Sequence, residues 1–458
     1  MAVGVGTALV TERSRRSRVL RTAVIVPLLV PPFVSAVAFT RAFGPGGLLD
    51  DVAGLTLPGL VGPVGIVLVM GVHAAPLVYL VVAASLASRA RPELEWAGRV
   101  AGGSRSFVLR RVTLPLLGPA IAGGAALAFV VSMNSFGIPA VLGIPAGFPT
   151  ITTRIYSDLA RSADPASFER ALVLAAVLVA VVLIVVITGD RFVRRAVRGR
   201  HAGSAREPAR PESGPGGAIV VWAYVVLTTG VPLAALTLTG LTKAVGLAPV
   251  PSNWTLGNFA EAWSGGAWGA AGRSLLLAAT AATVAAVLGV LASARSSPTW
   301  PGSVTAAAFA VPGSALAVAV LLAYGPWLRD TVLIVLVAYL AKFWALADRS
   351  IAGSLGAIDR DATRAARVSG APKALTLRRI VVPMVRPAVT AAWLLVFLFG
   401  LHELTMSSLL YGPGTATLAV HTLNVQQLGD ITVTAALAVL LTLPGLVTAV
   451  VVGRRRSA

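Results

Sequence analysis

Long apolar runs alternate with short polar and basic segments along the 458 residues of the chain. A bilayer core about 30 Å thick needs roughly 20 apolar residues in a helix. Pro and Gly inside several runs do not break the pattern, because neighbouring helices satisfy the freed backbone groups. The predicted spans are residues 22–41, 59–85, 115–137, 170–189, 217–241, 273–294, 303–324, 331–348, 385–402 and 432–453. We therefore expect an all-α fold: a polytopic membrane helical bundle with about ten transmembrane helices.

Composition supports a membrane protein. Apolar types make up 56% of the residues and charged types only 12%, whereas a soluble domain carries roughly 25% charged residues. A soluble enzyme is thereby excluded. There is no Cys, and the four His are scattered, so no metal site is expected.

The net charge of +20 is unevenly distributed along the chain. If the N-terminus is cytoplasmic, 31 Lys and Arg fall in cytoplasmic segments and 7 outside, while the acids divide 9 and 9. This excess follows the positive-inside rule. The charge therefore records orientation rather than nucleic-acid binding, and it predicts a multi-pass plasma-membrane protein with both termini cytoplasmic.

A polar segment divides the chain into two halves. Residues 199–216 contain no large apolar side chain and predict a flexible cytoplasmic linker. Residues 1–198 hold four predicted spans and residues 217–458 hold six. We expect each half to be one copy of a repeat, with the first copy lacking about two N-terminal spans. An N-terminally truncated gene model or a naturally shortened protein would account for the difference.

The repeat is clearest in two basic loops, residues 97–115 and 365–383, which match at an offset of 268. The matching pairs are Ala97 and Ala365, Arg99 and Arg367, Val100 and Val368, Gly102 and Gly370, Leu109 and Leu377, Arg110 and Arg378, Arg111 and Arg379, and Pro115 and Pro383. Each loop leads into a span, and its glycine can form a turn between short helices. One interpretation is a basic loop that sets topology and touches anionic lipid. Two copies with matching Gly and Pro favour the other interpretation, a docking element.

These loops resemble the Glu-Ala-Ala (EAA) loop of binding-protein-dependent ABC importer permeases. The first copy supplies Glu95, Trp96, Ala97, Gly98, Gly102, Arg110, Arg111 and Pro115. The second supplies Arg364, Ala365, Ala366, Gly370, Arg378, Arg379 and Pro383. Trp96 and Arg364 stand where the family has its Glu. The resemblance implies that both loops dock an ATPase.

Two permease halves in one chain look most like the ferric-iron permeases, whose relatives include thiamine, polyamine and phosphonate permeases. The string 135–140 (SFGIPA) and the string 402–405 (HELT) carry this resemblance. It implies import of a small solute, with iron(III) the best match. The implied partners are a cytoplasmic ABC ATPase dimer, an extracytoplasmic substrate-binding protein and the lipid bilayer.

The chain has no phosphate-loop motif. It is therefore expected to be a transport subunit, not an enzyme, with no cofactor of its own; ATP and Mg²⁺ would be bound by the partner ATPase. Two other functional classes are alternatives. An ion-driven secondary transporter predicts membrane-centre carboxylates, and a lipid-modifying enzyme predicts catalytic polar residues clustered at one interface.

Four residues are candidates for the translocation pathway. His402 and Glu403 end a predicted span, and the offset of 268 pairs them with Asn134 and Ser135. Equivalent positions in pseudo-symmetric halves can face a shared pathway. The alternative is that they lie hydrated among lipid headgroups.

Overall fold

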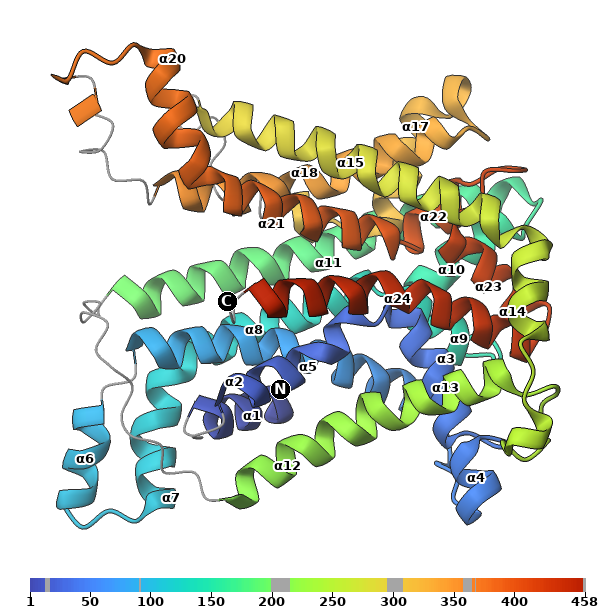
Figure 1. Ribbon diagram of the computed structural model, residues 1–458, viewed down its shortest axis with the longest axis horizontal. Coiled ribbons are helices and arrows are strands. Elements are labelled where there is room, and N and C mark those ends of the chain that lie inside the picture. The colour runs from blue at the N-terminus through green and yellow to red at the C-terminus, as the bar shows by residue number, and fades with distance from the viewer. Residues whose placement is uncertain are drawn as a thin grey trace. The chain divides into compact units, whose positions relative to one another are not determined.

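The computed structural model describes residues 1–12, 17–89, 92–198, 215–294, 308–356, 365–366 and 368–455. Within these residues every regular element is a helix, and β-type pairing is limited to one isolated bridge between Thr242 and Trp254. The predicted all-α class is confirmed (Figure 1).

The chain forms two compact units that are not consecutive in sequence. Unit 1 comprises residues 1–154, 180–259 and 431–458, and unit 2 comprises residues 155–179 and 260–430. The first and last helices after the predicted linker therefore belong to unit 1. The predicted domain boundary at 199–216 falls largely outside the described residues.

Unit 1 is built from helices of both halves. Its helices are α1 (Ala2–Glu12), α2 (Ser17–Ile25), α3 (Pro32–Phe43), α4 (Leu48–Ala53), α5 (Pro63–Arg89), α6 (Pro92–Val100), α7 (Arg105–Val108), α8 (Leu114–Asn134), α9 (Gly137–Leu142), α12 (Pro215–Val225), α13 (Val231–Leu241) and α24 (Ile431–Arg455). The 3-10 turns η1 (Val26–Leu29) and η4 (Pro251–Asn253) and the π-helical turns η2 (Leu109–Thr113) and η3 (Val226–Gly230) complete it.

Small residues let helices of unit 1 approach closely. α13 packs against α3 and α24, and α5 packs against α1 and α8. A Cβ on Gly240 of α13 would lie 3.1 Å from the Ala436 backbone nitrogen of α24. Such glycine contacts are typical of membrane helix pairs, whose association depends on close packing.

Unit 2 has a core of three long helices. Its elements are η5 (Trp263–Ala267), α15 (Trp268–Ala294), α17 (Gly313–Leu328), α18 (Val332–Gly356), α20 (Lys373–Thr376), η6 (Leu377–Val381), α21 (Val382–Leu401), α22 (Thr405–Leu410) and α23 (Leu418–Gln427). Three helices, α10 (Ile151–Ala160), α11 (Pro165–Arg198) and α14 (Gly257–Ala262), cross a unit boundary.

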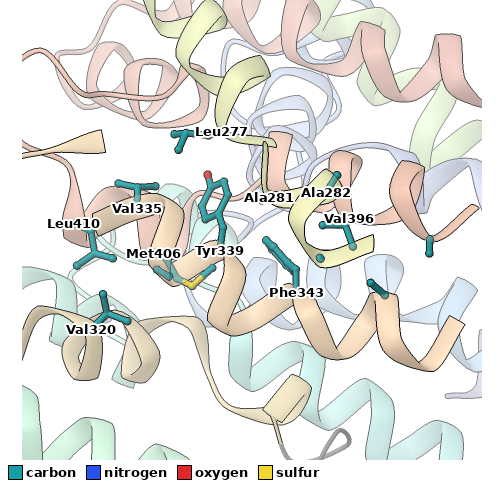
Figure 2. Close-up of a cluster of buried hydrophobic side chains, with 14 of the residues drawn as sticks. Leu277, Ala281, Ala282, Val320, Val335, Tyr339, Phe343, Val396, Met406 and Leu410 are labelled. Atoms are coloured by element: carbon teal, nitrogen blue, oxygen red, sulfur yellow. The ribbon is translucent and has the colours of Figure 1, made fainter. Parts of the chain in front are cut away.

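The core of unit 2 lies where α15, α18 and α21 pack together. Ala281 and Ala282 are fully buried on α15, and a Cβ on Gly400 of α21 would lie 3.3 Å from the Cα of Ala278. Figure 2 shows Tyr339 and Phe343 of α18 in this cluster, with Met406 of α22 beside them. The cluster fixes the short helix α22 against α18.

The repeat seen in the sequence recurs in the helices. α7 corresponds to α20, η2 to η6 and α9 to α22. In each pair, both the first and the last residue differ by the offset of 268. The architecture of two fused repeats is thereby confirmed.

The described residues contain seven helical stretches that are long and apolar enough to span a membrane. They are Pro63–Leu86, Arg105–Asn134, Pro165–Phe192, Gly216–Leu241, Gly257–Leu291, Val382–Leu401 and Ile431–Thr448. The segment predicted at 22–41 is a helix pair, Val19–Leu29 and Pro32–Ala53, bent by 97°.

The remaining two predicted spans are less complete. Residues 303–324 correspond to the 16-residue α17, and α18 covers 331–348 but carries Lys342, Asp348 and Arg349. Counting the bent pair as one span gives eight, so the expected number of ten is not confirmed.

Candidate functional site

The first repeated loop is a helix–turn–helix at one end of unit 1, where α6 lies beside α7 (Figure 1). Glu95 of α6 accepts a hydrogen bond from the Thr113 hydroxyl of η2 at 2.6 Å. Gly98 faces the same way, because a Cβ there would lie 3.1 Å from the Val108 side chain. These contacts attach α6 firmly to the segment that continues into α8.

The turn after α6 depends on Gly102. Its φ of +84° lies in the left-handed region, which costs glycine little. The Gly103 amide donates to the Gly98 carbonyl at 3.0 Å, which is the Schellman pattern that ends helices. Ser104 then caps α7 by accepting a hydrogen bond from the Phe107 amide at 3.2 Å.

The second loop repeats this turn in unit 2. Gly370 has a φ of +75°, and the Ala371 amide donates to the Ala366 carbonyl at 3.0 Å. The Thr376 amide then bonds to the Pro372 carbonyl at 3.1 Å. The backbone of both loops therefore has one design, although their side chains differ.

Most of the other predicted loop residues are exposed, including Pro115, whereas Ala366 is half-buried. Trp96, Ala97, Arg110 and Arg111 are exposed in the first loop, and Ala365, Arg378, Arg379 and Pro383 are exposed in the second. Pro115 and Pro383 are the second residues of α8 and α21. Arg364 lies outside the described residues.

The first pair of pathway candidates lies in unit 1, at the end of α8. The Asn134 side-chain amide donates to the Val130 carbonyl at 2.8 Å, and the Ser135 carbonyl accepts from the Thr152 hydroxyl at 3.0 Å. In this structure the Asn134 side chain therefore bonds to its own helix, α8, and the backbone of Ser135 is bonded to α10.

The second pair, His402 and Glu403, follows α21 in unit 2. The Glu403 carboxylate accepts hydrogen bonds from the Met406 amide at 2.9 Å and from the Ser407 amide at 3.0 Å. The Ser407 hydroxyl adds a third at 3.1 Å. Glu403 thus caps α22, because it accepts from the amides that a helix start leaves unpaired.

Sequence reasoning missed the other members of this polar group. The Tyr339 hydroxyl lies 2.8 Å from the Ser407 hydroxyl. Lys342 donates to the Val311 carbonyl at 2.5 Å and is attracted electrostatically to Glu403. Lys342 lies inside α18, in the part that corresponds to the predicted span 331–348. A lysine alone in an apolar run is the signal that could have found it.

The segment before α23 is tied to α15. The Arg273 guanidinium donates to the Ala416 carbonyl at 2.8 Å, and the Ser274 hydroxyl accepts from the Leu418 amide at 2.8 Å. Burial, together with the nearby Arg273 charge, lowers the pKa of His421. His421 is therefore neutral at pH 7.

Within the described part of the chain, no three His, Asp or Glu side chains gather where they could hold a metal ion. The polar groups described above cap helices and fix turns. The fold defines a multi-pass membrane protein with a repeated loop in each of its two units.

The chain belongs to the family of binding-protein-dependent transport system inner membrane components, which it matches over residues 1–198 and 285–455. It is thus a multi-pass inner-membrane permease of the ABC importer class.

Three permease proteins from other organisms are similar to this chain in sequence. The ferric transport system permease protein FbpB of Actinobacillus pleuropneumoniae is 25% identical over 452 residues, which is 93% of this chain and 64% of that protein. The molybdenum transport system permease protein ModB of Mycobacterium tuberculosis is 34% identical over 191 residues, 40% of this chain and 70% of that protein. A 2-aminoethylphosphonate permease protein described as putative, PhnV of Salmonella typhimurium, is 28% identical over 219 residues, 46% of this chain and 82% of that protein.

Proposed function

We propose that this chain is the permease subunit of an ABC importer for iron(III), with both termini cytoplasmic. The observation that supports iron(III) as the substrate is the match to the ferric permease FbpB. This match runs through both repeats and covers 93% of the chain. The relatives named for molybdenum and aminoethylphosphonate match less than half of it. An extracytoplasmic binding protein would deliver the iron.

The two turned loops are the proposed docking sites for a cytoplasmic ATPase dimer, which would bind ATP and Mg²⁺. A loop that transmits force must be rigidly joined to the helix that it moves. Glu95 and Gly98 join α6 to η2, and η2 runs directly into α8. In the second loop, η6 likewise runs directly into α21. Closure of the ATPase dimer would therefore move both spans and open the bundle alternately to each side.

The test is transport by the purified complex in proteoliposomes, with the chain, its ATPase and its binding protein present. We expect ATP-dependent uptake of iron(III). Molybdate and 2-aminoethylphosphonate are supplied in parallel, and an ATPase whose phosphate-loop lysine is replaced serves as the control. Uptake of another solute instead would refute the iron assignment. Uptake by this chain alone without ATP would favour an ion-driven transporter.

Molybdate is the second candidate substrate. The molybdenum permease ModB has a higher identity, 34%, although over 191 residues only. Competition between molybdate and iron(III) for uptake in the same proteoliposomes separates the two.

A further inference from the structure

Helix α6 has two different faces. Glu95 and Gly98 face the rest of unit 1, as their contacts with Thr113 and Val108 show. The opposite face is exposed and carries Glu93, Trp96 and Val100, spaced three and four residues apart. Residues at this spacing share one side of a helix.

The two apolar side chains of this outer face are both exposed. Trp96 is 64% exposed and Val100 is 89% exposed. Trp96 and Val100 lie four residues apart and so neighbour each other on this face, and neighbouring exposed apolar side chains favour an interaction surface. Trp is also among the residues that contribute most binding free energy at protein interfaces.

The second loop shares only part of this surface. Val368, the counterpart of Val100, is also 89% exposed, and Ala365 is exposed like Ala97. No Trp is present, since the sequence has Arg364 at the position of Trp96. The two loops thus present the same backbone turn and the same exposed Val, but only the first adds an aromatic side chain.

We propose that Trp96 and Val100 are the apolar anchor by which the first loop binds the ATPase, with Glu93 as the ionic contact at its edge. This inference rests on the proposed function. It assigns to the ATPase an apolar pocket for the Trp96 ring with a basic group at its rim. The ATPase dimer is then held unequally, more tightly by the first loop than by the second.

The repeated turn argues for a partner with two similar surfaces, as an ATPase dimer has. A lipid surface is the competing occupant, because Trp and basic residues also gather at membrane interfaces. However, Glu93 shares the face of Trp96, and anionic headgroups repel a carboxylate. The exposed Arg105, Arg110 and Arg111 lie on α7 and η2 instead. These elements suit the headgroups, whereas the outer face of α6 suits a protein.

The test measures the affinity of the purified chain in nanodiscs for its purified ATPase. Removing a Trp that dominates an interface weakens binding by about 30-fold or more. We expect this loss for Trp96→Ala, less than about fivefold for Trp96→Phe, which keeps an aromatic ring, and less than about fivefold for Val368→Ala. The matched control is Trp327→Ala on α17, since Trp327 is 76% exposed and lies outside both loops.

The outcomes separate this inference from the proposed function. If the unaltered chain binds its ATPase and Trp96→Ala binds equally well, the anchor is wrong while the proposed function stands. If the unaltered chain does not bind, both fail. Thermal unfolding of the Trp96→Ala protein checks that the fold is intact, as expected for an exposed position.

A second measurement distinguishes protein from lipid. The chain has no Cys, so Val100→Cys introduces its sole thiol. We expect a maleimide reagent to label this thiol in nanodiscs of anionic lipid and the added ATPase to protect it. Protection by the lipid alone would overturn the proposal and assign the face to the membrane.

Discussion

Gly102 and Gly370 offer a test of whether the two loops depend on their turns. A Cβ at either position would meet nothing within 4 Å, so substitution creates no clash. The cost comes from the backbone alone, because φ values of +84° and +75° place an L-residue in the left-handed region. For Ala this costs about 1–2 kcal/mol, which corresponds to roughly a 5- to 30-fold shift in the local equilibrium of the turn.

The assay is hydrogen exchange in the loop, because the Gly103 and Ala371 amides close the two turns. We expect Gly102→Ala to speed exchange in the first loop by roughly 5- to 30-fold and to lower ATP-driven uptake. Gly102→Asn should be milder, since Asn tolerates the left-handed region, and Gly102→Val should be worse. Equal effects of Asn and Val would refute the backbone argument. The same order is expected at Gly370, independently, because it lies in the other unit.

Three further predictions follow from side-chain contacts. Glu95→Ala leaves the buried Thr113 hydroxyl without its carboxylate acceptor and should destabilise α6 by about 1–2 kcal/mol, seen as faster hydrogen exchange over residues 92–100; exchange unchanged from the parent would contradict this. Glu403→Ala removes the cap of α22 and should lower the free energy of unfolding by about 2 kcal/mol, whereas Glu403→Gln, which keeps one acceptor oxygen, should lose less in the same melting assay. The lowered pKa of His421 means that the folded state favours the neutral ring, so its contribution is present above pH 6.5 and is lost as pH falls below it; His421→Gln should flatten the thermal stability between pH 7 and 5, and an unchanged slope would refute the assignment.

The hydrophobic pattern predicted most of the fold because apolar length is what a bilayer requires. Seven predicted spans coincide with long apolar helices. The pattern could not show that Pro31 and Pro32 bend the first predicted span, because a proline in an apolar run is compatible with either a straight or a broken helix. It also could not show that α24, at the end of the second half, packs in unit 1 against α3 and α13. Interleaving of this kind is set by long-range packing, which no local period encodes.

The candidate site was predictable where it depends on backbone. Gly102 and Gly370 were expected to form turns from their positions in the repeat, and their φ values agree. Which side of α6 faces the protein was not predictable. Glu93 and Glu95 are two residues apart and so lie on opposite sides of the helix, and either could have faced inward. The structure turns Glu95 inward to Thr113 and leaves Glu93 on the outer face with Trp96. In a helix only nine residues long, the sequence does not show which of these two carboxylates faces the protein, because that depends on the packing of α6 against η2.

The two repeats share their loops but not their membrane chemistry. At the offset of 268, the positions of Tyr339, Lys342, Glu403 and Ser407 are occupied in the first repeat by Gly71, Ala74, Ser135 and Pro139. The second repeat thus has a lysine, a carboxylate and two hydroxyls around the start of α22, and the first has none of these except the hydroxyl of Ser135. Buried polar groups cost free energy unless they are paired, so a group of this kind persists only where it is fully bonded or where function requires it.

The capping bonds of Glu403 satisfy the first of these conditions. If the group did no more than cap α22, the reach of the carboxylate at position 403 to the Met406 and Ser407 amides would matter for stability alone. Glu403→Asp, which retains the charge and shortens the reach to α22, therefore separates the two roles. A loss of stability with uptake per folded molecule unchanged would assign Glu403 to capping alone, whereas a loss of uptake at unchanged stability would assign the position of its carboxylate, together with Lys342, to the pathway.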